Sequence, residues 1–168
     1  MSARRMLVLF GHPGRGGFNE AALRGAERAA QAGQPLQLEW ISDHDSAARA
    51  GRIAQLCDAG PELVIVHGGQ GDAPVAEVAP RYPRTQFAIT QGHHTAANVA
   101  SYEIQQEHSA FLAGVLAGLR AANGRAAHLS GEKVRPGLKG RAAYADGVRR
   151  VTGRDPLTAF CGNQHDPA

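Results

Sequence analysis

The fold of this chain follows from residues 6–20, MLVLFGHPGRGGFNE. The apolar run at residues 6–10 predicts a buried strand, the glycines after it predict a tight turn, and the residues after the turn predict a helix. Such a turn leaves main-chain N–H groups accessible to a ligand at the positive end of the helix dipole. We therefore expect the first ligand contacts here, although every α/β domain also needs tight strand-to-helix connections.

Short apolar runs and amphipathic stretches alternate along the rest of the chain. We expect strands at residues 6–10, 36–41, 63–66, 85–90, 98–104, 125–129 and 157–161, and helices at residues 19–32, 46–58, 73–81, 108–120 and 139–151. This alternation predicts an α/β fold with three layers, α/β/α, around a mostly parallel sheet. Because the pattern restarts after Gly124, we expect a first lobe at residues 1–122. Residues 123–168 should begin a second lobe or form an extra βαβ unit.

A second glycine-rich turn, residues 67–72 (HGGQGD), follows the aliphatic run at residues 63–66. The carboxyl ends of neighbouring parallel strands meet at one rim of a sheet, so both glycine-rich turns should open onto a common crevice. Gln91 follows the fourth expected strand, so we expect it to face the same crevice and to contact the ligand. The candidate ligand-binding residues are Gly17, Phe18, Asn19, His67, Gly68, Gly69, Asp72 and Gln91.

Composition narrows the classes of function. A formal net charge of +3 and the lack of a basic run longer than two residues give no electrostatic support for binding nucleic acid. No stretch approaches the ~20 apolar residues of a membrane span, and the first residues do not form a signal peptide, so we expect a cytoplasmic protein. Cys57 and Cys161 lie far apart without metal-ligand spacing, which favours reduced thiols.

The expected helix at residues 108–120 combines two kinds of residue. Large apolar residues form a stripe, and the small residues Ala113, Gly114, Ala117 and Gly118 lie between them. Small residues on a helix allow a second backbone to approach closely, so we expect this helix to pack tightly against another element.

Several segments lie in a characteristic order along the chain. They are residues 17–20 (GFNE) with Gly25, 63–68 (LVIVHG), 78–83 (VAPRYP), 85–89 (TQFAI), 98–99 with Ser101, and Glu107 with 111–117 (FLAGVLA). In their order and spacing these segments resemble the basic membrane protein family, and the resemblance covers most of the chain. Proteins of that family are solute-binding lipoproteins of the type I periplasmic-binding-protein fold that capture purine nucleosides for ABC transporters.

The resemblance implies a non-enzymatic protein without a cofactor, in which two α/β lobes hold a small polar ligand between them. It implies that Phe18 stacks on a base, that Asn19 bonds polar ligand edges, and that Gly68, Gly69 and Asp72 lie on the adjoining loop. Two features depart from the family: Thr90 stands where an acidic residue usually ends the fourth strand, and the second lobe is half built. We therefore expect a homodimer, or a binding function that has been altered or lost.

Two other classes of function stay open from the sequence. Residues 11–13 (GHP), 18–19 and 22–23 are similar to the opening of flavodoxin-like, FMN-dependent NAD(P)H:quinone reductases, but the aromatic turn that covers the flavin in that family is missing. A purely structural role as an assembly lobe is the other alternative. The histidines lack zinc-ligand spacing and no serine or cysteine lies in a nucleophile-elbow pattern, so we assign no metal-binding or catalytic residue.

Overall fold

The computed structural model describes residues 4–14, 17–131 and 133–162. The chain divides into two compact units: unit 1 extends to Glu103 and unit 2 begins at Ile104. The expected boundary at residues 122/123 therefore differs from the observed one. The helix at residues 107–120 packs against the following helix, so it belongs to unit 2.

Unit 1 contains a five-stranded sheet with strand order β2-β1-β3-β4-β5, and every pair of neighbouring strands is parallel. The α/β fold class expected from the sequence is confirmed. The strands are β1 (Arg5–Phe10), β2 (Gln37–Ile41), β3 (Leu63–His67), β4 (Gln86–Thr90) and β5 (Val99–Tyr102). The helices are α1 (Gly17–Gln31), α2 (Ser46–Cys57) and α3 (Asp72–Val78), with short 3₁₀ helices η1 (Gly69–Gly71) and η2 (Ala79–Arg81) on either side of α3.

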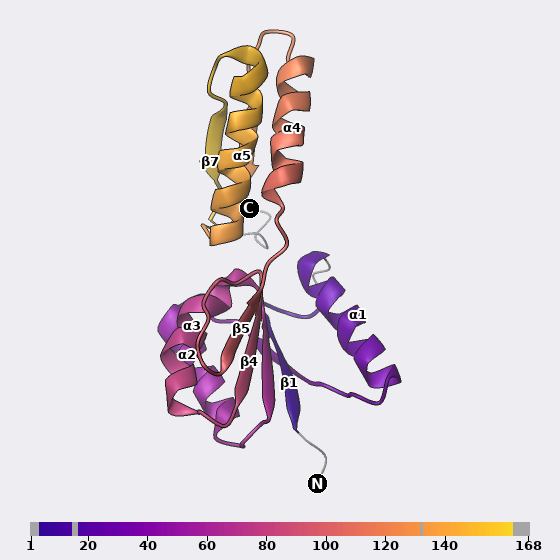
Figure 1. Ribbon diagram of the computed structural model, residues 1–168, viewed down its shortest axis with the longest axis vertical. Coiled ribbons are helices and arrows are strands. Elements are labelled where there is room, and N and C mark those ends of the chain that lie inside the picture. Colours follow the sequence, from indigo (N-terminus) through magenta and orange to yellow (C-terminus); the bar gives the residue numbers. More distant parts are fainter. Residues whose placement is uncertain (1–3, 15–16, 132, 163–168) are drawn as a thin grey trace. The chain divides into compact units, whose positions relative to one another are not determined.

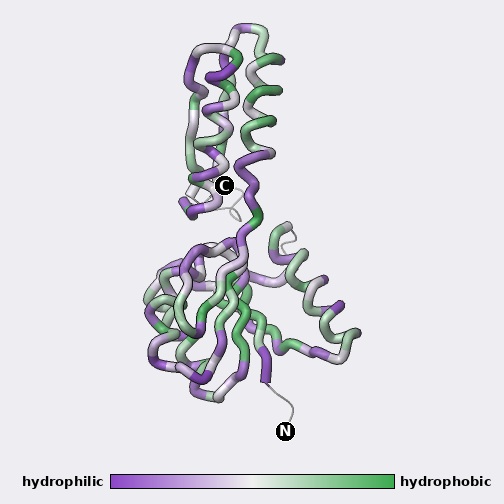
Figure 2. The backbone as a smooth tube through the Cα atoms, viewed as in Figure 1, coloured by the Kyte–Doolittle hydropathy of each residue, from purple (hydrophilic) through white to green (hydrophobic). Residues whose placement is uncertain are grey.

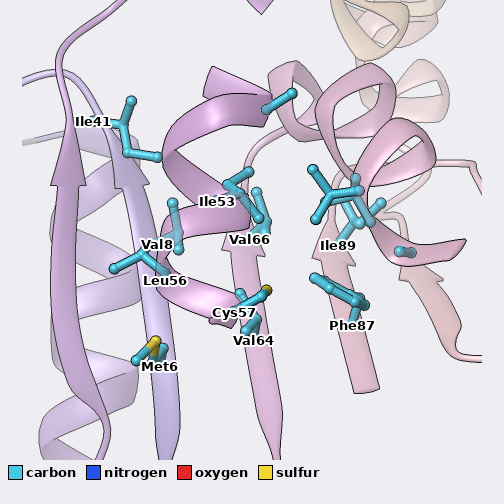
Figure 3. Close-up of a cluster of buried hydrophobic side chains, with 14 of the residues drawn as sticks. Met6, Val8, Ile41, Ile53, Leu56, Cys57, Val64, Val66, Phe87 and Ile89 are labelled. Carbon is cyan, nitrogen blue, oxygen red and sulfur yellow. The ribbon is translucent and has the colours of Figure 1, made fainter. Parts of the chain in front are cut away.

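The sheet of unit 1 is covered on both faces. Helix α1 lies on one face, and α2 and α3 lie on the other (Figure 1). On the α2 and α3 side, Ile53 of α2 packs with Val66 and Ile89 of the strands, all three fully buried (Figure 3). On the α1 side, Leu7 and Leu9 pack with Ala26. Alternate residues of one strand thus pack into the cores on opposite faces of the sheet. Packing on both faces fixes the position of the strand ends from which the loops leave.

Unit 2 contains α4 (Glu107–Arg120), β6 (Ala127–Ser130), α5 (Arg135–Thr152) and β7 (Leu157–Phe160), with β6 and β7 paired in parallel. Helix α5 begins four residues earlier than expected because Pro136 is tolerated in the first turn of a helix. Helices α4 and α5 meet backbone to backbone: a Cβ atom on Gly114 would lie 2.1 Å from the Tyr144 carbonyl oxygen, and one on Gly147 would lie 2.1 Å from the Phe111 carbonyl oxygen. The close packing expected from the small residues of α4 is confirmed.

The two faces of the β6–β7 pair differ. On the α5 side, the Tyr144 hydroxyl donates to the Ala127 carbonyl (3.0 Å) and the guanidinium of Arg141 lies 4.8 Å from the Phe160 ring. On the opposite side, Leu129 and Leu157 are each 70% exposed. The apolar stripe of α4 is also exposed, at Leu112, Leu116 and Leu119, and Figure 2 shows hydrophobic residues along this helix. Unit 2 therefore carries apolar surface that its own described elements leave open.

Within the described residues, no helix is both long enough and apolar enough to cross a membrane.

Candidate functional site

The candidate site lies at the rim where β1, β3 and β4 end. These strands are neighbours in the sheet, so the loops that leave them start side by side. The first loop leads to Phe18 at the start of α1, and the second begins at Gly68. A Cβ atom on Gly68 would lie 3.6 Å from the Phe18 ring and only 2.5 Å from Gln70 Oε1, and its φ of +118° also favours glycine. The two glycine-rich turns therefore meet at one rim, as the sequence analysis expected.

Phe18 and His67 form a stacked pair. Their ring centroids are 3.9 Å apart and the ring planes differ by 21°. The Phe18 side chain nevertheless stays 48% exposed, whereas His67 is buried at 9% exposure. One face of the Phe18 ring thus rests on the imidazole, while about half of the residue's surface stays exposed to solvent.

His67 uses both ring nitrogens inside the protein. Its Nε2 lies 3.1 Å from the Phe18 carbonyl oxygen, and its Nδ1 lies 2.8 Å from the Thr90 hydroxyl. A carbonyl only accepts, so Nε2 carries the proton and Nδ1 accepts from Thr90. Burial lowers the pKa of His67, with the hydrogen bond to Phe18 opposing this shift, so the neutral ring predominates at neutral pH. His67 supports Phe18 here, and a direct ligand contact from it stays a prediction.

Asn19 ties the start of α1 to the end of β1. Its Nδ2 donates to the Phe10 carbonyl over 2.9 Å, and the residue is 9% exposed. This bond holds Phe18 at the rim through the adjacent backbone. The hydrogen bond from Asn19 to a ligand, which the resemblance implies, stays a prediction.

Asp72 fixes the loop that follows β4. Its Oδ1 accepts from the main-chain N–H groups of His93 (3.0 Å) and His94 (3.1 Å), and its Oδ2 lies 2.6 Å from the His93 Nδ1. A Cβ atom on Gly92 would lie 2.7 Å from Asp72 Oδ1, so only glycine fits between the carboxylate and β4. The sequence predicts Asp72 at the site but does not reveal these partners. Its ligand contact stays a prediction.

Gln91 has an unusual backbone at the end of β4. Among the described residues it is the one non-glycine residue with a positive φ, +58°, and its N–H donates to the Tyr102 carbonyl over 2.6 Å. Non-glycine residues in this region carry strain that the surrounding structure must hold. Its Oε1 is buried and has no hydrogen-bond partner among the described residues. The capacity of this buried oxygen to accept a hydrogen bond is therefore unused within the described residues.

Other features do not coincide with this rim. The described residues contain no group of three histidine, cysteine, aspartate or glutamate side chains placed to hold a metal ion. A hollow of about 1090 Å³ lies at the opposite rim of unit 1, where Arg4, Asp58 and Arg84 are among its lining residues. The candidate site is therefore the rim at the ends of β1, β3 and β4, where the exposed ring of Phe18 lies.

Comparison with known families identifies the chain. The profile of the family "ABC transporter substrate-binding protein PnrA-like" matches residues 6–154. The chain belongs to this family. The resemblance to the basic membrane protein family is confirmed, and it displaces the flavodoxin-like alternative, since the same match covers the segments on which that alternative rested.

Solved structures of solute-binding proteins share the fold of this PnrA-like chain. An ABC transporter solute-binding protein from Aeropyrum pernix K1 matches with a TM-score of 0.79 and 26% identity, over 98% of this chain and 49% of that chain. A solute-binding protein from Conexibacter woesei DSM 14684 matches with a TM-score of 0.61 and 22% identity, over 98% and 56% of the two chains. A search among curated proteins finds no significant match.

A third match, like the second, has too low a sequence identity to show more than the fold. The periplasmic binding protein/LacI transcriptional regulator from Alkaliphilus metalliredigens QYMF, in complex with D-xylulofuranose, has a TM-score of 0.74 at 14% identity, over 96% of this chain and 58% of that chain. The chain therefore has the α/β fold of a type I periplasmic-binding-protein lobe, and it spans about half the length of these solved relatives.

Proposed function

We propose that this PnrA-like chain is a non-enzymatic binding protein for a small polar ligand with a flat ring, of the purine nucleoside class, and that it serves an ABC transporter. Membership of a substrate-binding family supports a ligand and a transporter. The ring of Phe18, 48% exposed at the rim and backed by His67, is the observation that supports a flat ring.

The proposed contacts divide between stacking and hydrogen bonding. Stacking of a base on an aromatic side chain contributes about 1–3 kcal/mol, so Phe18 would supply a large share of the binding free energy. Rotation of the Gln91 side chain would expose its unpartnered Oε1, which would then accept from an N–H or O–H group of the ligand. Gly17, Asn19, Gly68, Gly69 and Asp72 complete the proposed set, with backbone N–H groups near the start of α1 as further donors.

A binding panel tests this function. We expect adenosine, guanosine or inosine to raise the melting temperature and to bind in calorimetry, whereas D-ribose, which has no flat ring, should not. Phe18→Ala should weaken nucleoside binding about fivefold to 150-fold, the equivalent of the stacking free energy. Leu38→Ala is the matched control, because Leu38 is 43% exposed on β2. If no nucleoside or base binds, the nucleoside proposal is wrong.

We also propose that the chain forms a homodimer through unit 2. Support comes from the exposed leucines of α4 and of the β6–β7 pair, since contiguous exposed apolar side chains mark interaction surfaces. Light scattering at several concentrations would measure the mass in solution.

A further inference from the structure

A directed chain of hydrogen bonds joins the three loops of the rim. The Gly68 N–H lies 3.2 Å from Thr90 Oγ1, Thr90 Oγ1 lies 2.8 Å from His67 Nδ1, and His67 Nε2 lies 3.1 Å from the Phe18 carbonyl oxygen. These contacts connect residues that are 22, 23 and 49 positions apart in the sequence.

The Phe18 end of this chain fixes its direction. The Phe18 carbonyl can only accept, so in the neutral ring His67 Nε2 carries the proton and Nδ1 accepts from the Thr90 hydroxyl. The Gly68 N–H donates to Thr90 Oγ1 and also, over 3.1 Å, to the Thr90 carbonyl. The Phe18 carbonyl thus selects the Nε2–H tautomer of His67, and the Thr90 hydroxyl, which can donate as well as accept, satisfies Nδ1 in that tautomer.

The same imidazole also supports the ring of Phe18. The centroid separation of 3.9 Å places the His67 ring directly against one face of the phenyl ring, and His67 is itself buried. Backbone and side chain of Phe18 are therefore both held by one residue. A side chain held in this way loses less conformational entropy when a ligand binds.

We propose that His67 is a positioning residue for the ligand, and that the Thr90 hydroxyl supports it by donating to Nδ1. His67 holds Phe18 so that a flat ligand ring stacks on the free face and becomes the outer member of a three-ring column, ligand–Phe18–His67. This inference rests on the proposed function for the ligand, but the hydrogen-bonded support of Phe18 stands without any ligand.

The first experiment uses the ligand-free protein. Long-range ¹H–¹⁵N NMR spectra of the histidine rings report which nitrogen carries the proton. We expect His67 of the wild-type chain to be the Nε2–H tautomer. Thr90→Val keeps the side-chain shape but removes the hydroxyl, so the Nδ1 resonance should lose the shift that comes from accepting a hydrogen bond while Nε2 keeps the proton, whereas Thr90→Ser should restore that shift. An Nδ1 resonance that Thr90→Val leaves unchanged would overturn the role of Thr90, and an Nδ1–H tautomer in the wild type would overturn the whole chain of bonds.

The second experiment measures adenosine binding by calorimetry. His67→Ala removes both stacking and hydrogen bonding, and we expect the affinity to fall about tenfold or more. Thr90→Val should lower it about twofold to tenfold, the value of one hydrogen bond. Thr95→Val is the matched control, because Thr95 is exposed and takes no part in the chain of bonds.

The two experiments separate the inference from the proposed function. If adenosine binds and both His67→Ala and Thr90→Val bind it as well as the wild type does, His67 is not a positioning residue. If the wild type binds neither adenosine nor another nucleoside, the proposed function fails, and the NMR result alone decides whether His67 holds Phe18. Melting temperatures confirm that each variant is folded.

Discussion

Unit 1 and unit 2 use similar sequence patterns but bury them differently. In unit 1, the apolar residues of the strands enter two cores, one on each face of the sheet. In unit 2, the closest packing joins two helix backbones at Gly114 and Gly147, while large leucines on α4, β6 and β7 stay exposed. A pattern of apolar residues therefore predicts a helix or a strand. Those residues are buried only where another part of the protein covers them.

We expect the largest loss of stability from a cavity in the core of unit 1. Ile89 is fully buried, and Ile89→Ala should lower the free energy of unfolding by about 2–5 kcal/mol through lost contacts and a cavity. Denaturant unfolding followed by fluorescence of Trp40, on β2 of unit 1, measures this change. Leu38→Ala is the control, since Leu38 is 43% exposed on β2 of the same unit and its truncation should have a much smaller effect. Equal effects of both changes would show that the core of unit 1 is not packed as described.

A smaller effect should appear at the helix contact of unit 2. Gly147→Ala places a methyl group 2.1 Å from the Phe111 carbonyl, and we expect a loss of about 1–3 kcal/mol as the helices separate. Circular dichroism reports the loss of helix, and Trp40 fluorescence shows whether unit 1 unfolds with it.

Gly51 provides the control for this variant. It lies in α2 with open space around its Cβ position, so Gly51→Ala should be neutral or slightly stabilising. A Gly147→Ala variant as stable as Gly51→Ala would show that the α4–α5 contact is looser than described.

Substitution of the exposed leucines of α4 tests the comparison without changing a residue of either core of unit 1. Replacing Leu112, Leu116 and Leu119 with glutamine should convert the proposed dimer into a monomer while the melting temperature of unit 1 changes little. Light scattering measures the mass. A wild-type chain that is monomeric at all concentrations would contradict the proposed homodimer.

The smallest effect concerns pH. Burial lowers the pKa of His67 below its unfolded value of 6.5, so the unfolded state binds more protons near and below that pH. The stability that His67 contributes is therefore full above pH 6.5 and declines as the pH falls, by at most about 1.4 kcal/mol per pH unit. Unfolding free energies at pH 7.5 and 5.5 should differ less in His67→Gln than in the wild type, and an equal difference would contradict this prediction.

The sequence was sufficient to predict the order of strands and helices, because the alternation of apolar and amphipathic segments and the positions of the glycines are local signals. It also predicted that the turns at Phe18 and Gly68 share a rim, since both follow strands of one parallel sheet. The boundary of unit 2 was missed because the pattern of α4 does not reveal which helix it packs against. The partners of His67 and Asp72 were missed because these contacts link residues 21 or more positions apart and leave no local pattern.

The glycine contact between α4 and α5 has a practical consequence for protein engineering. Since carbonyl groups and Cα atoms rather than side-chain shapes set the spacing at Gly114 and Gly147, the alignment of these two helices is insensitive to what their outer faces carry. Solubilising substitutions, fluorescent labels or cross-linking cysteines could then be introduced at exposed positions of α5, such as Ala142 and Arg150, away from the α4 leucines of the proposed dimer. The contact makes this pair a robust attachment point for reporters.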